Sequence, residues 1–332
     1  MKVAAAPLLM LAVLSATLLS QSNPFKADTS RPVIAASEYE NWRNTLSNWG
    51  RWGKGDELGA LNLITPAKRR AALALVRDGV PVSLSSNANT QAAPDVPCPN
   101  EWAMVAASQG AATDRIAYPC IHGAGTTHID SLAHIFFDGV AWNGVPVSEV
   151  VSREGGALRH SVLAMKDGIL TRAVLYDIPR LKGVPYLEPG TRIFPEDLEA
   201  WEKLTGAAAG PGDAVLLRWG RWARRTALGP WPIDQGAAGF DNSVIPWLKK
   251  RDVALIAWET PGYVPQPPGD LPRLALHNFA LTMLGIMLVD RADLDAAAEA
   301  AAARKRWEFM ITVAPLRIPN GTGSPVNPIA MF

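Results

Sequence analysis

Three of the five histidines of this 332-residue chain lie close together in the sequence, at His122, His128 and His134, and Asp130 lies among them. Imidazole and carboxylate groups are the usual ligands of catalytic zinc and related divalent ions, and three protein ligands leave one coordination position open for water or substrate. One such histidine alone would more often be an ordinary hydrogen-bonding loop residue. Four such groups within so short a segment instead predict a metal or catalytic site.

The spacing of these residues suits a shared site. His128 and Asp130 are two residues apart, so on an extended backbone their side chains leave on the same face. Gly123 and Gly125 would let the intervening chain fold tightly and bring His122 back toward them. We therefore expect these three side chains to bind a divalent cation, for which zinc and manganese are both candidates.

Such a cation can polarise a carbonyl and bring the pKa of a bound water near neutral. If an amide is attacked, the leaving nitrogen needs a proton donor, and His134 suits that role because imidazole titrates near neutral pH. Apolar walls for a small-molecule substrate are expected from Trp102, Phe136 and Phe137. The hypothesis is hydrolysis of a C–N bond in an aryl formamide, a cyclic amide or an imide, or opening of a related lactone, by metal-activated water.

Other functions remain open at this stage. A serine hydrolase is disfavoured because the chain has no G-x-S-x-G nucleophile elbow. A cyclase or dehydratase could use the same metal site for addition or elimination. A periplasmic metal- or ligand-binding protein would bind metal without turnover, and it would suffer no specific penalty from the loss of His134.

The segment His128-Ile-Asp130-Ser-Leu-Ala-His134, with Gly-Thr-Thr before it, resembles a known signature. This is the H-x-G-T-H-x-D-x-P-x-H motif of the cyclase family that includes bacterial kynurenine formamidase and isatin hydrolase. Two extra residues separate the first two histidines here, and Leu132 replaces the proline of the motif. Residues 52–66, 186–190, 211–218 and 317–328 are similar to other segments of that family.

The resemblance implies a single α/β domain with a mixed β-sheet core, flanking helices and the swivelling β/β/α-like fold of the family. It also implies a homo-oligomer, a small-molecule substrate and an acid/base role for His134. In two-metal members, a histidine near the start of a late helix and an acidic residue one strand later complete the centre. His277 and Asp290 fall at those places, with Asp290 where the family usually has Glu. His160 matches no motif and is expected to be structural.

Charge and cysteine content limit the remaining possibilities. The net charge of +1 and the lack of a basic run argue against nucleic acid as a partner. Cys98 and Cys120 are the only cysteines, and whether they pair stays open. A ligand role for Cys120 is disfavoured because the C-x-x-C spacing of structural zinc sites is absent.

The N-terminus has the features of an export signal, with Lys2 before an apolar run over 3–19 and polar Gln21 after it. The run is short for a bilayer span and lacks a basic stop-transfer flank, so no stable membrane span is expected after cleavage. We expect a signal peptide at 1–22, a leader at 23–38 and a hydrolase domain at 39–332. The mature protein would then be periplasmic or secreted.

Apolar periodicity alternates between helical and strand-like along the chain, which predicts an α/β fold in one domain. Helices are predicted at 39–52, 66–78, 195–205, 274–284 and 292–304, and strands at 80–85, 161–165, 173–176, 214–218, 253–258 and 309–314.

Overall fold

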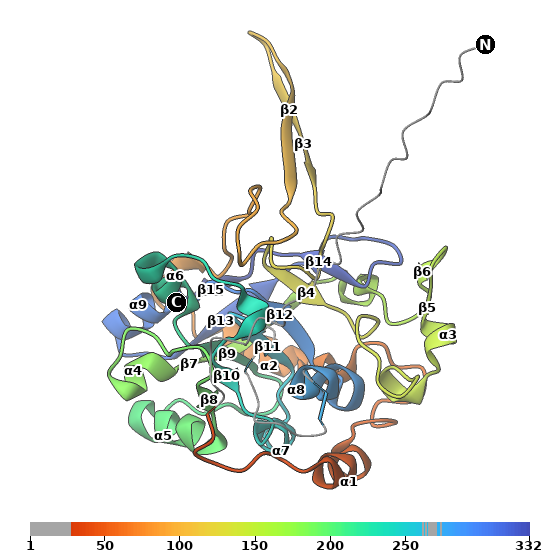
Figure 1. Ribbon diagram of the computed structural model, residues 1–332, viewed down its shortest axis with the longest axis vertical. Helices are drawn as coiled ribbons and strands as arrows, with labels where there is room; N and C mark the ends of the chain where they lie inside the picture. Colours follow the sequence, from red (N-terminus) through yellow and green to blue (C-terminus); the bar gives the residue numbers. More distant parts are fainter. Residues whose placement is uncertain (1–27, 261, 263, 265–270, 273) are drawn as a thin grey trace, which may run out of the picture.

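A mixed β-sheet runs through the centre of the molecule, and helices pack around it (Figure 1). The computed structural model describes residues 28–260, 262, 264, 271–272 and 274–332, so the expected signal peptide at 1–22 lies outside the described residues. In the described part the sheet has nine strands. In spatial order they are β1 (Pro81–Ser83), β15 (Ile329–Met331), β13 (Glu308–Val313), β7 (Ile169–Asp177), β9 (Ala214–Arg218), β11 (Leu255–Trp258), β12 (Met287–Asp290), β4 (His128–Asp130) and β14 (Gly323–Pro325).

The four central strands, β7, β9, β11 and β12, are mutually parallel, and the strands outside them pair antiparallel. Every residue of β9, β11 and β12 is buried. Strands covered on both faces are expected to read as continuous apolar runs, as these do. The predicted fold class, a single α/β domain with a mixed sheet and flanking helices, is confirmed.

Most of the predicted helices and strands are present, with shifted ends. The helix at 195–205 and the strand at 214–218 match α5 and β9 at both ends. The helix expected at 274–284 continues from α8 into one wider turn, Ala280–Leu284. The α-helices are α1 (Ala36–Leu46), α2 (Pro66–Leu73), α3 (Val147–Val150), α4 (Ile178–Lys182), α5 (Pro195–Thr205), α6 (Arg221–Leu228), α7 (Val244–Lys250), α8 (Ala275–Phe279) and α9 (Asp295–Arg304). None of the described helices is long and apolar enough to span a membrane.

The strand predicted at 161–165 is wrong. Its apolar residues form a short 3₁₀ helix, Val162–Met165, in which Ala164 N–H donates to Ser161 O at 3.0 Å. A run of four apolar residues carries too little periodicity to separate a strand from a helical turn.

A two-stranded arm stands away from the body of the protein (Figure 1). It consists of β2 (Glu101–Ala107) and β3 (Ala112–Ala117), which pair antiparallel and were not predicted from the sequence. Trp102, expected as a wall of the substrate pocket, lies on this arm instead with 52% of its surface exposed, and its indole N–H donates to Asp114. The remaining short strand pairs are β5 (Val151–Ser152) with β6 (Gly156–Ala157) and β8 (Arg192–Ile193) with β10 (Gly239–Phe240).

The described part of the leader packs onto the domain. The buried Arg192 guanidinium donates to the backbone carbonyls of Asp28, Arg31 and Pro32, and it pairs with Asp241. This segment therefore contacts the folded body before α1 begins.

Candidate metal centre

The short strand β4 lies between β12 and β14, and this position brings distant residues together. His128 pairs in register with Asp290 on one side, and Asp130 pairs with Gly323 on the other. The Nδ1–H of His128 donates to Thr126 O at 3.0 Å, which leaves Nε2 free to face other groups. That Nε2 lies 3.6 Å from Asp130 Oδ1 and 4.0 Å from Asp290 Oδ2.

Asp130 is fully buried at the middle of the cluster. His122 Nδ1 lies 2.6 Å from its Oδ1, whereas His277 Nε2 and His134 Nε2 lie 3.3 and 4.0 Å from its Oδ2. Burial alone raises the pKa of Asp130, but the charges and hydrogen bonds of the surrounding imidazoles outweigh it and hold the pKa well below its usual range. The carboxylate is therefore ionised at neutral pH.

His122 follows a disulfide between Cys98 and Cys120, which answers the question of pairing and leaves no free thiolate as a ligand. Gly123 N–H donates to Cys120 O at 2.9 Å, and a Cβ on Gly123 would lie 2.9 Å from Cys120 Cβ. A Cβ on Gly125 would lie 3.0 Å from Cys98 O. The glycines thus allow the chain to pass close to the disulfide on its way into β4.

His134 lies one turn after β4, and its ring stacks on that of His122 with centroids 3.5 Å apart and planes 6° apart. Burial lowers the pKa of His134 to about 4, although the Asp130 carboxylate acts in the opposite direction. The ring is therefore neutral at pH 7.

His277 comes from α8 and Asp290 from the end of β12. His277 Nε2 lies 3.6 Å from Asp290 Oδ2. Burial lowers the pKa of His277, but the nearby Asp130 and Asp290 carboxylates outweigh it and raise the pKa to about 9. Asp290 also accepts a hydrogen bond from Trp258 Nε1. Its short side chain thus reaches the cluster where the resembled family usually has Glu.

Two overlapping groups of side chains have ligand atoms within 4.8 Å of one another: His122, Asp130 and His134, and His128, Asp130 and Asp290. Among the described residues, His128 Nε2 and Asp130 Oδ2 are buried and have no hydrogen-bond partner. A divalent cation would satisfy both atoms, and the nitrogen and oxygen donors suit zinc or manganese. The residues present therefore fit the implied metal.

Some contacts of the centre carry no signal in the local sequence. The two nitrogens of the His122 ring contact Asp130 Oδ1 and Thr322 Oγ1, the latter at 2.8 Å from Nε2. A metal bound by His122 would replace one of these two contacts. Thr322 is 200 residues further along the chain. Only the pairing of β14 with β4 could have revealed it.

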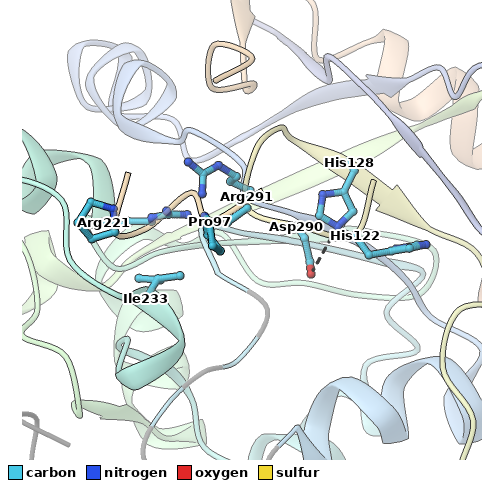
Figure 2. Close-up of a pocket in the computed structure, with 10 residues that line it drawn as sticks. Pro97, His122, His128, Arg221, Ile233, Asp290 and Arg291 are labelled. Atoms are coloured by element: carbon cyan, nitrogen blue, oxygen red, sulfur yellow. Dashed lines mark ion pairs between the residues drawn. The ribbon is translucent and has the colours of Figure 1, made fainter. Parts of the chain in front are cut away.

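A pocket of about 160 Å³ opens beside the cluster. His122 and His128 lie at one end of it and Arg221 and Ile233 at the other (Figure 2), and Figure 2 marks the His128–Asp290 ion pair. Phe136 and Phe137, expected as apolar walls, are not among its lining residues. Among the described residues, those that line the pocket are Pro94, Pro97, His122, Gly123, Ala124, His128, Arg221, Ile233, Asp290 and Arg291.

The chain is similar to known proteins in sequence and in fold. The family model "Putative cyclase" matches residues 82–263. A crystal structure described as a novel cyclase is 29% identical with a TM-score of 0.75, covering 87% of this chain and 99% of that one. Isatin hydrolase A from Labrenzia aggregata, bound to benzyl benzoate, is 18% identical with a TM-score of 0.51, covering 76% and 93% of the two chains. An isatin hydrolase bound to the product analogue thioisatinate is 14% identical with a TM-score of 0.50, covering 81% and 99%.

The matches below 25% identity show a shared fold. No curated protein matches the chain. Because the family model spans more than half of the sequence and includes the histidine cluster, this chain belongs to the cyclase family.

Proposed function

We propose that this protein is a metal-dependent hydrolase that opens the C–N bond of an aryl formamide, a cyclic amide or an imide. The observation that carries this proposal is the pair of buried ligand atoms, His128 Nε2 and Asp130 Oδ2, which have no hydrogen-bond partner within a cluster of imidazoles and carboxylates. The fold shared with isatin hydrolases supports the choice of reaction.

In this proposal His122, His128 and Asp130 hold the cation, with His277 and Asp290 as further ligands. The metal, zinc or manganese, would polarise the scissile carbonyl and lower the pKa of water. In the hydrolysis, water oxygen bonds to the carbonyl carbon, and the C–N bond breaks. His134 passes a proton taken from that water to the leaving nitrogen.

His134 is placed for this transfer by its neighbours. Stacking on His122 holds the ring beside Asp130, and its side chain keeps 22% of its surface exposed toward solvent. Because burial keeps the ring neutral at pH 7, it can accept a proton before it donates one.

The location and assembly of the protein belong to the same proposal. The signal peptide proposed at 1–22 would deliver the mature chain to the periplasm or the exterior. The Cys98–Cys120 disulfide supports that location, because disulfides persist in oxidising compartments. We also propose a homo-oligomer.

The test is elemental analysis of the purified mature protein beside turnover of N-formylkynurenine and isatin, before and after chelation. Bound zinc or manganese with chelator-sensitive opening of either compound supports the proposal. Stoichiometric metal without turnover of any amide or lactone would favour a binding protein, and protein that binds no metal even after reconstitution would overturn the proposal.

A further inference from the structure

Two buried arginines line the pocket beside the metal centre. Arg221 is the first residue of α6, and Arg291 follows Asp290 directly. They are 1% and 2% exposed. Among the described residues, Nε of each arginine and Nη2 of Arg291 have no hydrogen-bond partner. Buried N–H groups of a cation are unfavourable without an acceptor, so these N–H groups favour an acidic ligand in the pocket.

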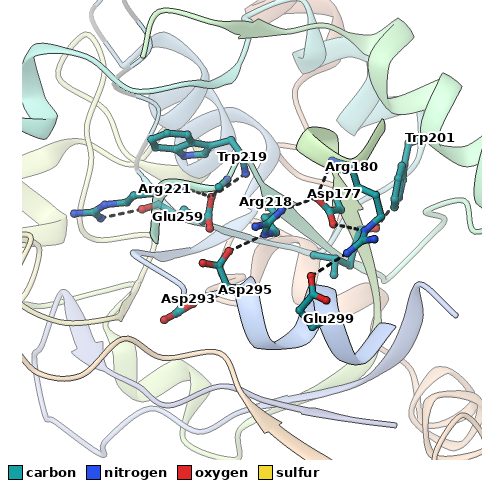
Figure 3. Close-up of polar contacts among 12 residues, drawn as sticks. Asp177, Arg180, Trp201, Arg218, Trp219, Arg221, Glu259, Asp293, Asp295 and Glu299 are labelled. Atoms are coloured by element: carbon teal, nitrogen blue, oxygen red, sulfur yellow. Dashed lines mark hydrogen bonds and ion pairs between the residues drawn. The ribbon is translucent and has the colours of Figure 1, made fainter. Parts of the chain in front are cut away.

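The charges around these arginines do not balance. Asp95 Oδ2 lies 3.1 Å from Arg221 Nη2, 2.8 Å from Arg225 Nε and 4.0 Å from Arg291 Nη2. One carboxylate therefore faces three guanidinium groups. The Glu259 carboxylate is engaged elsewhere, since its Oε2 accepts the backbone N–H groups that begin α6 (Figure 3). Asp95 alone therefore does not satisfy the N–H groups of these guanidinium groups.

Both guanidinium groups are held in place before any ligand arrives. Arg221 Nη1 donates to the Glu259 backbone carbonyl at 3.1 Å. The Cζ atoms of Arg221 and Arg291 lie 4.6 and 5.1 Å from the centre of the Trp222 ring. Arg291 Nη1 donates to the Asp95 backbone carbonyl at 3.4 Å. Groups fixed in this way lose little conformational freedom when they bind an acid.

The rest of the lining is mostly apolar. Pro94, Pro97, Ala124 and Ile233 line the space that also holds the arginines and the histidines. A ligand that fits this pocket has an apolar body and one acidic group. The planar fork of arginine matches a carboxylate, with which it forms strong charge-assisted hydrogen bonds.

We propose that Arg221 and Arg291 bind a carboxylate of the substrate, while the C–N bond to be broken lies at the histidine end of the pocket. This inference rests on the proposed function and narrows it. The preferred substrates are amides that carry a carboxylate apart from the bond being hydrolysed, such as an N-formyl aryl amino acid, over neutral compounds such as isatin.

The test compares ligands that differ only in the acid. Anthranilate and aniline are titrated calorimetrically into the metal-loaded protein, and turnover of N-formylkynurenine is compared with that of its decarboxylated analogue, N-formylkynuramine. We expect anthranilate to bind at least about 10-fold more tightly than aniline. The analogue should show a kcat/KM lower by about 10-fold or more.

Arg221→Met should weaken anthranilate binding by about 10- to 100-fold and leave aniline binding unchanged. Arg221→Lys keeps the charge without the fork and should recover part of the affinity. The control is Arg31→Met, which removes an exposed arginine paired with Glu196. It should leave the binding of both ligands unchanged. If Arg221→Met does not fold, the inference is tested by the binding of anthranilate and aniline to the wild-type protein and to Arg221→Lys.

Equal binding of anthranilate and aniline would overturn the inference. Anthranilate binding that is unchanged in Arg221→Met would also overturn it, since the carboxylate of the ligand would then bind elsewhere, for example to the metal. Turnover of N-formylkynuramine equal to that of N-formylkynurenine would overturn it and leave the proposed function intact. Arginine-dependent binding of anthranilate without turnover of any amide would support the carboxylate site and contradict the hydrolase.

Discussion

His134 lies slightly further from Asp130 than His122 does, and its proposed role depends on that difference. Its ring lies face to face with that of His122, but its Nε2 is 4.0 Å from Asp130 Oδ2, whereas His122 Nδ1 is at hydrogen-bond distance from Asp130. A ligand and a proton carrier would both suit this place. Only removal of the side chain separates the two roles.

We predict that His134→Ala retains the metal and loses turnover by about 10²- to 10⁴-fold, the range expected when a general acid is removed. Metal content and kcat are measured on the same sample. The control is His160→Asn, at a buried residue with φ of 57° that asparagine tolerates, and it should keep metal and turnover. Loss of metal from His134→Ala would show that His134 is a ligand.

A second residue, Asp95, should control stability. It is fully buried and is the shared acceptor of Arg221 and Arg225. Burial raises the pKa of Asp95, but the surrounding arginines outweigh it and lower the pKa below the ordinary 3.8. We predict that Asp95→Asn lowers the free energy of unfolding at pH 7 by about 3–5 kcal/mol, because it leaves buried guanidinium groups without their anion.

The pH dependence of this effect has a definite sign. A carboxylate with a lowered folded-state pKa stabilises the protein above its unfolded pKa, and the stabilisation disappears as the pH falls through the folded pKa. In urea unfolding the difference between wild type and Asp95→Asn should stay constant from neutral pH down to about pH 5 and shrink below pH 3.8. A difference that does not vary with pH would contradict the assignment.

At the scale of elements, β14 supports the metal centre without supplying a ligand. A Cβ on Gly323 would lie 2.6 Å from His122 Cε1 and 2.8 Å from Ile129 O. The glycine therefore leaves the space in which the His122 ring lies beside Asp130. The chain needs a residue without a side chain at this register position, opposite Asp130.

We predict that Gly323→Ala displaces His122 and weakens metal binding by about 10- to 100-fold, the usual effect of disturbing the support of a ligand. Competition with a chelator measures the metal affinity. Gly55→Ala is the matched control, since a Cβ there meets nothing within 4 Å. Unchanged affinity in Gly323→Ala would mean that His122 is not a ligand.

At the scale of the whole molecule, the arm of β2 and β3 exposes apolar side chains, among them Trp102, Met104, Val105 and Ile116. Exposed apolar side chains gathered on one element often mark an interaction site. A second copy of the chain is the partner we expect, in line with the proposed homo-oligomer. The arm stands clear of the body, so it could reach a neighbouring subunit (Figure 1).

We predict that Val105→Lys with Ile116→Lys shifts the protein to a smaller species in sedimentation velocity, because two charges would be buried in the contact. Leu204→Lys, at an exposed apolar residue of α5, is the control and should leave the sedimentation unchanged. A wild-type protein that sediments as a monomer at all concentrations would contradict the proposal.

What the sequence predicted well is local. Helix α5 has a proline at its first position and acidic residues in its first turn, and it is followed by Gly206 in the left-handed conformation, all of which are readable from neighbours. Strand β9 is a run of buried residues after a glycine-proline turn. The hairpin arm was missed because its strands are exposed on nearly every residue and show no alternation of apolar and polar side chains.

The sequence by itself identified the candidate ligands and the candidate acid, because His122, His128, Asp130 and His134 lie within one short segment whose spacing and motif are readable without a fold. Only the tertiary structure decided what surrounds that segment. The contact of Asp130 with His277 and the register of β4 with β12 and β14 join residues far apart in the sequence. The arginine-lined wall arises in the same way, since Arg221, Arg291 and Asp95 meet only when the sheet is assembled. Long-range contacts of this kind leave no periodic pattern in any local window, so their chemistry appears only in the folded chain.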